Sequence, residues 1–133
     1  VVDMCGGYEG EPKVEVHGVA HITGGGIPGK LGRVLKKSGL GANIDNPFDP
    51  PKIMGHCQEK GDVTDGEAYQ TWNMGQGMFV ITPDPDSVLT IARDRSHGLE
   101  SQVVGTVTAQ SGIWITNKGL YKDSRELVFE PKG

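Results

Sequence analysis

A run of three glycines directly after an alternating segment is the feature that most constrains this chain. Residues 14–22 read VEVHGVAHI, and their alternation of apolar and polar side chains has the period of a β-strand. Thr23, Gly24, Gly25 and Gly26 follow at once. Glycine has no Cβ and accepts positive φ, so successive backbone N–H groups can be exposed in a concave nest that suits an anion. The sequence predicts a strand that ends in a glycine loop, which is either a plain turn or an anion site.

Positive charge follows the loop closely. Lys30 and Arg33 lie within ten residues of it and can add cationic groups to an anion site. Residues 24–29 (GGGIPG) have the glycine spacing GxGxxG, but that spacing alone is a weak signal, and GxxxxGK[ST] fails at Leu31, so no nucleotide site is inferred from either signature. The residues alone therefore leave both interpretations of the loop open.

The rest of the chain predicts an α+β domain. Further strands are expected at 42–45, 101–108, 112–116 and 126–130, and within 74–82 after its glycines. Helices are expected at 51–60 and 86–96, and residues 65–73 fit a short helix or a turn. Residues 31–37 fit a strand or a helix equally well. Residues 1–13 are expected to hold the remnant of a helix, followed by a loop. The predicted fold is a single domain, residues 1–133, with a mixed, largely antiparallel sheet and helices packed on it.

Composition excludes several classes of function. A net charge of -4 offers no basic surface for nucleic acid. No apolar run approaches the ~20 residues that cross a bilayer, and no membrane partner is expected. Two cysteines without a CxxC spacing predict reduced thiols, although a disulfide between them stays open. The chain begins with Val rather than Met, so we expect it to be part of a longer protein.

Three motifs resemble one enzyme family. Residues 20–26 read AHITGGG, residues 30–35 read KLGRVL and residues 67–78 read EAYQTWNMGQGM. Together with the proline-rich stretch between them, they resemble in order and spacing the C-terminal domain of the aminoimidazole ribonucleotide synthetases, the phosphoribosylformylglycinamidine cyclo-ligases. The resemblance covers nearly the whole chain. The departures from the family pattern are Lys30 for Asn, Gly32 for Pro, Ala68 for Met, Gln70 for Arg and Trp72 for Phe.

The resemblance implies an activity. Enzymes of this family convert formylglycinamidine ribonucleotide to aminoimidazole ribonucleotide in purine biosynthesis, with release of ADP and phosphate. ATP and magnesium are bound mainly by an N-terminal domain that this chain lacks. The expected partners are the two substrates, that N-terminal domain and a second subunit in a homodimer. The expected location is the cytoplasm, and the isolated domain is expected to be inactive.

Candidate binding residues follow from the motifs. They are His21, Thr23, Gly24, Gly25, Gly26, Asn73 and Gly75, whereas no catalytic residue and no metal ligand is assigned. His17 and His21 lie ~13 Å apart along a strand, too far to share a metal ion. His21 either bonds the substrate or is an ordinary strand residue, and Asn73 either fixes the substrate or braces a loop. The effect of Gln70 in place of Arg is left open.

Two other functions remain possible from the sequence. One is another member of the same ATP-binding superfamily, such as formylglycinamidine synthetase, selenophosphate synthetase or thiamine-monophosphate kinase. The other is a free-standing, non-catalytic interaction module. His56 and His97 are expected to be surface residues in either case.

Overall fold

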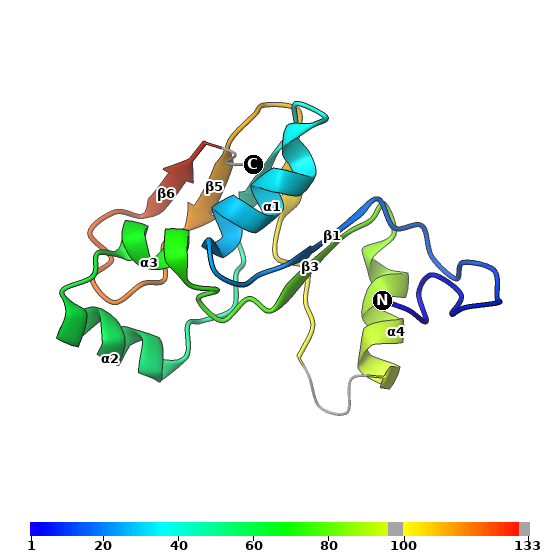
Figure 1. Ribbon diagram of the computed structural model, residues 1–133, viewed down its shortest axis with the longest axis horizontal. Helices are drawn as coiled ribbons and strands as arrows, with labels where there is room; N and C mark the ends of the chain where they lie inside the picture. Colours follow the sequence, from blue (N-terminus) through cyan, green and yellow to red (C-terminus); the bar gives the residue numbers. More distant parts are fainter. Residues whose placement is uncertain (96–99, 131–133) are drawn as a thin grey trace. The chain divides into compact units, whose positions relative to one another are not determined.

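The computed structural model describes residues 1–95 and 100–130 (Figure 1). Its helices are α1 (Gly26–Lys36), α2 (Lys52–Gly61), α3 (Asp65–Thr71) and α4 (Pro85–Arg95). Its strands are β1 (Gly18–His21), β2 (Gly41–Ile44), β3 (Met78–Ile81), β4 (Thr106–Thr108), β5 (Ile113–Thr116) and β6 (Glu126–Phe129). The predicted α+β class is confirmed. Contacts divide the chain into two compact units, Val1–Val19 with Val80–Val103 and Ala20–Phe79 with Val104–Gly133.

The larger unit is built on a four-stranded sheet in the order β4-β2-β5-β6. Strand β2 runs parallel to β5 and antiparallel to β4, while β6 is antiparallel to β5. One face of the sheet is apolar and buried, with side chains from Ala42, Ile44, Ile113, Ile115 and Phe129. Helix α1 contacts β2 and α3 (Figure 1), so this face and the helices share one core.

The smaller unit has its own apolar cluster. Met4, Val14 and Val88 are buried together, and Val80 and Ile91 pack against them. Asp84 accepts a hydrogen bond from the Ser87 N–H (3.2 Å) and so caps the start of α4. Residues 2–9 form successive turns rather than the helix remnant that the sequence suggested, because the two α-type bonds there, from the Cys5 N–H to the Val1 carbonyl and from the Gly10 N–H to the Gly6 carbonyl, are not consecutive.

Strands β1 and β3 form a two-stranded ladder. The His17 N–H donates to the Ile81 carbonyl (2.8 Å) and the Ile22 N–H donates to the Gly77 carbonyl (2.9 Å), which is an antiparallel arrangement. The predicted alternation holds, because Ala20 is buried while His17 and His21 are exposed. Regular strand geometry is nevertheless confined to Gly18–His21, a shorter strand than residues 14–22.

The structure decides the segments that the sequence left open. Residues 31–36 belong to helix α1, with Lys37 as its C-cap, and Asp65–Thr71 form helix α3. The strand expected after the glycines of residues 74–82 begins at Met78, directly after the tight turn of residues 73–76. The strand expected at 101–108 is reduced to Thr106–Thr108. None of the helices within the described ranges is long and apolar enough to cross a lipid bilayer.

Candidate functional site

The glycine loop lies against the end of helix α3. The Gly25 N–H donates to the Thr71 carbonyl (3.2 Å), and the Gly26 N–H donates to the Thr23 carbonyl (3.0 Å). On the preceding strand, the Ile22 N–H reaches the Gly77 carbonyl. Residues 20–26 and 67–78, the two longest motifs of the sequence, are thus joined by backbone hydrogen bonds at one place in the larger unit.

Gly26 is required for packing. It is the first residue of α1, it is buried, and its φ is +59°. A Cβ at this position would lie 2.0 Å from the Tyr69 carbonyl oxygen and 3.0 Å from that of Trp72. Only glycine permits so close an approach of two helix ends. Gly26 therefore sets the contact between α1 and α3, which leaves ligand contacts to its neighbours.

The exposed part of the loop has free donors. Thr23 and Gly24 are exposed, and within the described part of the chain no hydrogen bond is made by their N–H groups. Helix α1 starts beside them with no acidic residue in its first turn, so the positive end of its dipole is not neutralised. Lys30 is half-buried one turn further along. The free N–H donors, the positive end of α1 and Lys30 together favour the binding of a negatively charged group.

Asn73 and Gly75 form a tight turn beside the loop. The Asn73 carbonyl accepts from the Gln76 N–H (2.9 Å), and its Oδ1 accepts from the Gly75 N–H (3.1 Å). Met74 and Gly75 have φ values of 49° and 89°, the signs of a type I′ turn. The bracing role, one of the two alternatives for Asn73, is thus present in the structure. A Cβ on Gly75 would lie 2.9 Å from the Asp49 carbonyl oxygen, so glycine also allows this turn to pack on the proline-rich loop.

Gln76 holds the proline-rich loop in place. Its side-chain Oε1 accepts from the Phe48 N–H (3.1 Å) and its Nε2 donates to the Phe48 carbonyl (3.0 Å). Lys118 holds the same loop from another segment, donating from Nζ to the Pro47 carbonyl (2.7 Å) and contacting Asp49 (2.9 Å). Neither residue was singled out from the sequence, since nothing in a single glutamine or lysine shows that it will be buried.

A buried carboxylate anchors the loop that follows β5. Asp65 is fully buried at the start of α3 and accepts from the side chains of Gln58 (2.7 Å) and Asn117 (3.0 Å). The backbone N–H groups of Tyr121 (3.2 Å) and Lys122 (2.7 Å) complete the set. Burial raises the pKa of Asp65, but these hydrogen bonds outweigh it and hold the pKa below its ordinary value. Thr64–Glu67 shows a capping box, the only sequence signal near this network.

Tyr69 is buried between these two regions. Its hydroxyl oxygen accepts from the Lys118 N–H (3.3 Å). Burial raises the pKa of the phenol to about 12. The phenol is therefore neutral at physiological pH and serves as a structural hydrogen-bond acceptor rather than as an acid or a base.

The histidines do not converge on a site. His21 is exposed at the end of β1, next to the glycine loop. His17 is bonded to its neighbour Glu15 (2.6 Å), and His56 is exposed on α2, as expected. His97 lies outside the described residues. Cys5 and Cys57 are free and exposed and form no disulfide with each other.

The match to a family model decides which proteins this chain resembles. Residues 7–126 match the model described as AIR synthase related protein, C-terminal domain. The chain belongs to this family. Its two matching motifs, which the structure brings together, are part of the matched region.

Three curated relatives of this chain carry the name phosphoribosylformylglycinamidine cyclo-ligase. The protein of Picosynechococcus sp. is 38% identical over 100 residues, which is 75% of this chain and 29% of the relative. The protein of Methanosarcina acetivorans is 47% identical over 99 residues, 74% of this chain and 27% of the relative. The protein of Oceanobacillus iheyensis is 33% identical over 105 residues, which is 78% of this chain and 31% of the relative. The chain thus spans less than a third of the length of these relatives.

Proposed function

We propose that this chain supplies one wall of the substrate site of an ATP-dependent cyclo-ligase. The reaction converts formylglycinamidine ribonucleotide to aminoimidazole ribonucleotide, with release of ADP and phosphate, in purine biosynthesis in the cytoplasm. The observation that carries the proposal is the packing of the glycine loop on the 67–78 motif, through Gly25 and Gly26. The shared name of the curated relatives favours this reaction over those of other enzymes in the superfamily.

The role of the chain in this proposal is to bind an anionic part of the ribonucleotide. The N–H groups of Thr23 and Gly24 donate to the anion, and Lys30 adds a positive charge at the same end of α1. Asn73 and Gly75 keep the neighbouring turn in shape, and the Asn73 side-chain amide, with no partner for its Nδ2 among the described residues, faces the remaining polar groups of a ligand. His21 borders the loop and completes the candidate set.

ATP and magnesium belong to another part of the enzyme in this account. Within residues 1–95 and 100–130, no group of three or more His, Cys, Asp or Glu side chains is placed to hold a metal ion. We therefore assign no magnesium ligand among these residues and no step that involves the metal or ATP. We propose that an N-terminal domain binds both, and that the whole enzyme is a homodimer.

The proposal is tested by building a complete enzyme around this chain. In the Methanosarcina acetivorans relative, the C-terminal region that matches this chain is replaced by residues 1–133. ADP release is then measured with and without formylglycinamidine ribonucleotide. We expect release that depends on the ribonucleotide. A folded chimera that releases no ADP with this substrate, beside an active parent enzyme, would contradict the proposal.

A further inference from the structure

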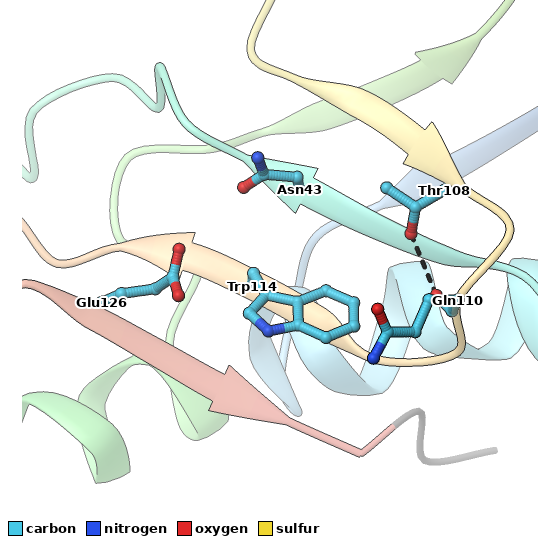
Figure 2. Close-up of a pocket in the computed structure, with 5 residues that line it drawn as sticks. All are labelled: Asn43, Thr108, Gln110, Trp114 and Glu126. Carbon is cyan, nitrogen blue, oxygen red and sulfur yellow. Dashed lines mark hydrogen bonds between the residues drawn. The ribbon is translucent and has the colours of Figure 1, made fainter.

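The outward face of the four-stranded sheet carries a small, polar-rimmed pocket that the proposed reaction does not use. It has a volume of about 230 Å³ and is lined by Asn43, Thr108, Gln110, Trp114 and Glu126 (Figure 2). Asn43 is the direct partner of Trp114 in the parallel β2–β5 pair. Glu126 pairs with Thr116, which makes it a diagonal neighbour of Trp114 on the same face. The strand register therefore places these side chains next to one another on one face of the sheet.

The indole of Trp114 forms the floor of this pocket. A Cβ on Gly112 would lie 2.5 Å from the indole Cη2, so the absence of a side chain at Gly112 makes room for the ring. In Figure 2 the indole lies between Glu126 and Gln110, with Asn43 and Thr108 on the neighbouring strands. The ring is half-buried, which leaves one π face accessible to a ligand.

Three polar side chains around this ring have no partner among residues 1–95 and 100–130. They are Asn43, Gln110 and Glu126, which no hydrogen bond or ion pair within those ranges engages. The Thr108 hydroxyl, in contrast, donates to the Gln110 carbonyl (2.9 Å). No described Lys, Arg or His belongs to the lining, so Glu126 makes the described lining negatively charged.

We propose that this pocket binds the guanidinium group of a small ligand. A planar cation stacks on the face of an indole, where the ring quadrupole attracts it. The same group donates two parallel N–H bonds to a carboxylate, here Glu126, and has further N–H donors for the amide oxygens of Asn43 and Gln110. An anion would be repelled by Glu126, and a neutral ring would leave the carboxylate unused. The volume lies below the ~300–1,000 Å³ of pockets for drug-sized ligands, which limits the occupant to a small group.

The binding of a monovalent guanidinium compound to the full chain tests this assignment. The probe is N-acetylarginine N-methylamide, titrated into ¹⁵N-labelled protein while the two indole N–H signals are followed by NMR; a Trp114→Phe variant assigns them. Because the pocket is open and the ligand small, we expect a dissociation constant on the order of 1 mM. The Trp114 signal should shift, and that of Trp72 should not. Neutral N-acetylcitrulline N-methylamide, which has nearly the same shape, should bind at least about tenfold more weakly.

Two charge variants distinguish binding in the pocket from nonspecific attraction of the cationic probe to an acidic protein. Glu126→Gln removes the pocket carboxylate and should weaken binding of the arginine probe about tenfold or more. Glu59→Gln removes one exposed carboxylate on α2 and should leave binding within twofold of the unmodified chain. Both residues are exposed, so neither change should prevent folding.

Three results would overturn the assignment. They are equal shifts of both indole signals, equal affinity for the arginine and citrulline probes, and unchanged affinity in Glu126→Gln. The outcome does not depend on the cyclo-ligase reaction, because the assay contains neither ATP nor ribonucleotide.

Discussion

Asp65 shows how one buried charge can organise a loop. Its carboxylate is surrounded only by donors, two from side-chain amides and two from the backbone N–H groups of Tyr121 and Lys122. A buried carboxylate with this many partners ties together segments that are far apart in the sequence, here α2, α3 and residues 117–122. Removing its charge leaves those donors without an acceptor.

Asp65→Asn should therefore destabilise the chain strongly. The new amide group turns an –NH₂ toward Gln58, Asn117 or a backbone N–H, so at least one donor faces another donor. We expect a loss of about 2–4 kcal/mol in the free energy of unfolding, measured in urea. Asp62→Asn is the matched control, because Asp62 is exposed and its left-handed backbone suits asparagine. Equal stability of the two variants would show that the network contributes nothing.

The raised pKa of Tyr69 predicts how the stability of the folded chain depends on pH in the alkaline range. Its pKa is about 12 in the folded chain against an ordinary value of 10.0. The unfolded chain therefore loses the phenol proton first, and stability falls as pH rises from about 10 to about 12. Two pKa units correspond to about 3 kcal/mol at most. Comparing unfolding of the unmodified chain and Tyr69→Phe across this range isolates the effect, and parallel pH profiles would refute it.

At the scale of elements, the sequence predicts the strands and helices with clear periodicity. Residues 51–60 and 86–96 predict helices close to α2 and α4, whereas only Gly18–His21 of the predicted strand 14–22 is regular. The start of β3 after Gly75 and Gly77 follows from the sequence, but the turn before it does not, because Met74 adopts a positive φ that this residue type seldom takes. The strand at 101–108 was overestimated, since residue pattern alone does not show that only Thr106–Thr108 finds a partner in β2.

The candidate site was predictable only in part. The glycine loop and the 67–78 motif were recognised from their residues, and each residue of the loop could be named in advance. Their contact, however, depends on Gly26 meeting the Tyr69 carbonyl, a long-range packing that no local pattern encodes. Gln76 and Lys118 were missed for the same reason, because their partners Phe48 and Pro47 are distant in sequence.

The packing of α1 on α3 leads to a prediction about two glycines of the same helix. Gly26→Ala should destabilise the chain by about 3 kcal/mol or more, since its Cβ would collide with the Tyr69 carbonyl at a left-handed backbone position. Gly29→Ala has open space around the new Cβ and should be neutral or stabilising by up to about 1 kcal/mol. Thermal unfolding of the unmodified chain and of both variants measures the two changes in stability. If Gly26→Ala melts like the unmodified chain, the contact is absent.

At the scale of the whole molecule, the chain should not catalyse the reaction by itself. The described residues offer no group of three or more His, Cys, Asp or Glu side chains placed to hold a metal ion, and the matched region is less than a third of the length of the curated relatives. We expect no ADP release when the chain alone is mixed with formylglycinamidine ribonucleotide and magnesium-ATP. Turnover by protein free of any longer enzyme would place the whole catalytic site within these 133 residues. It would refute the proposal that another domain binds ATP and magnesium.

The role of the glycine loop is tested most directly by Gly24→Val in the chimeric enzyme. A Cβ at Gly24 meets nothing within 4 Å and its backbone is not left-handed, so the variant should fold normally while its side chain blocks the approach of an anion. Losing one or two charge-assisted hydrogen bonds raises the KM for the ribonucleotide about 10- to 100-fold.

The KM for ATP serves as the internal reference, and Gly66→Val, which also has open space at its Cβ, is the matched control. The account predicts a large rise in the ribonucleotide KM for Gly24→Val, little change in the ATP KM, and kinetics like those of the parent chimera for Gly66→Val. A folded Gly24→Val enzyme with an unchanged ribonucleotide KM would contradict the account, because the loop would then be only a turn.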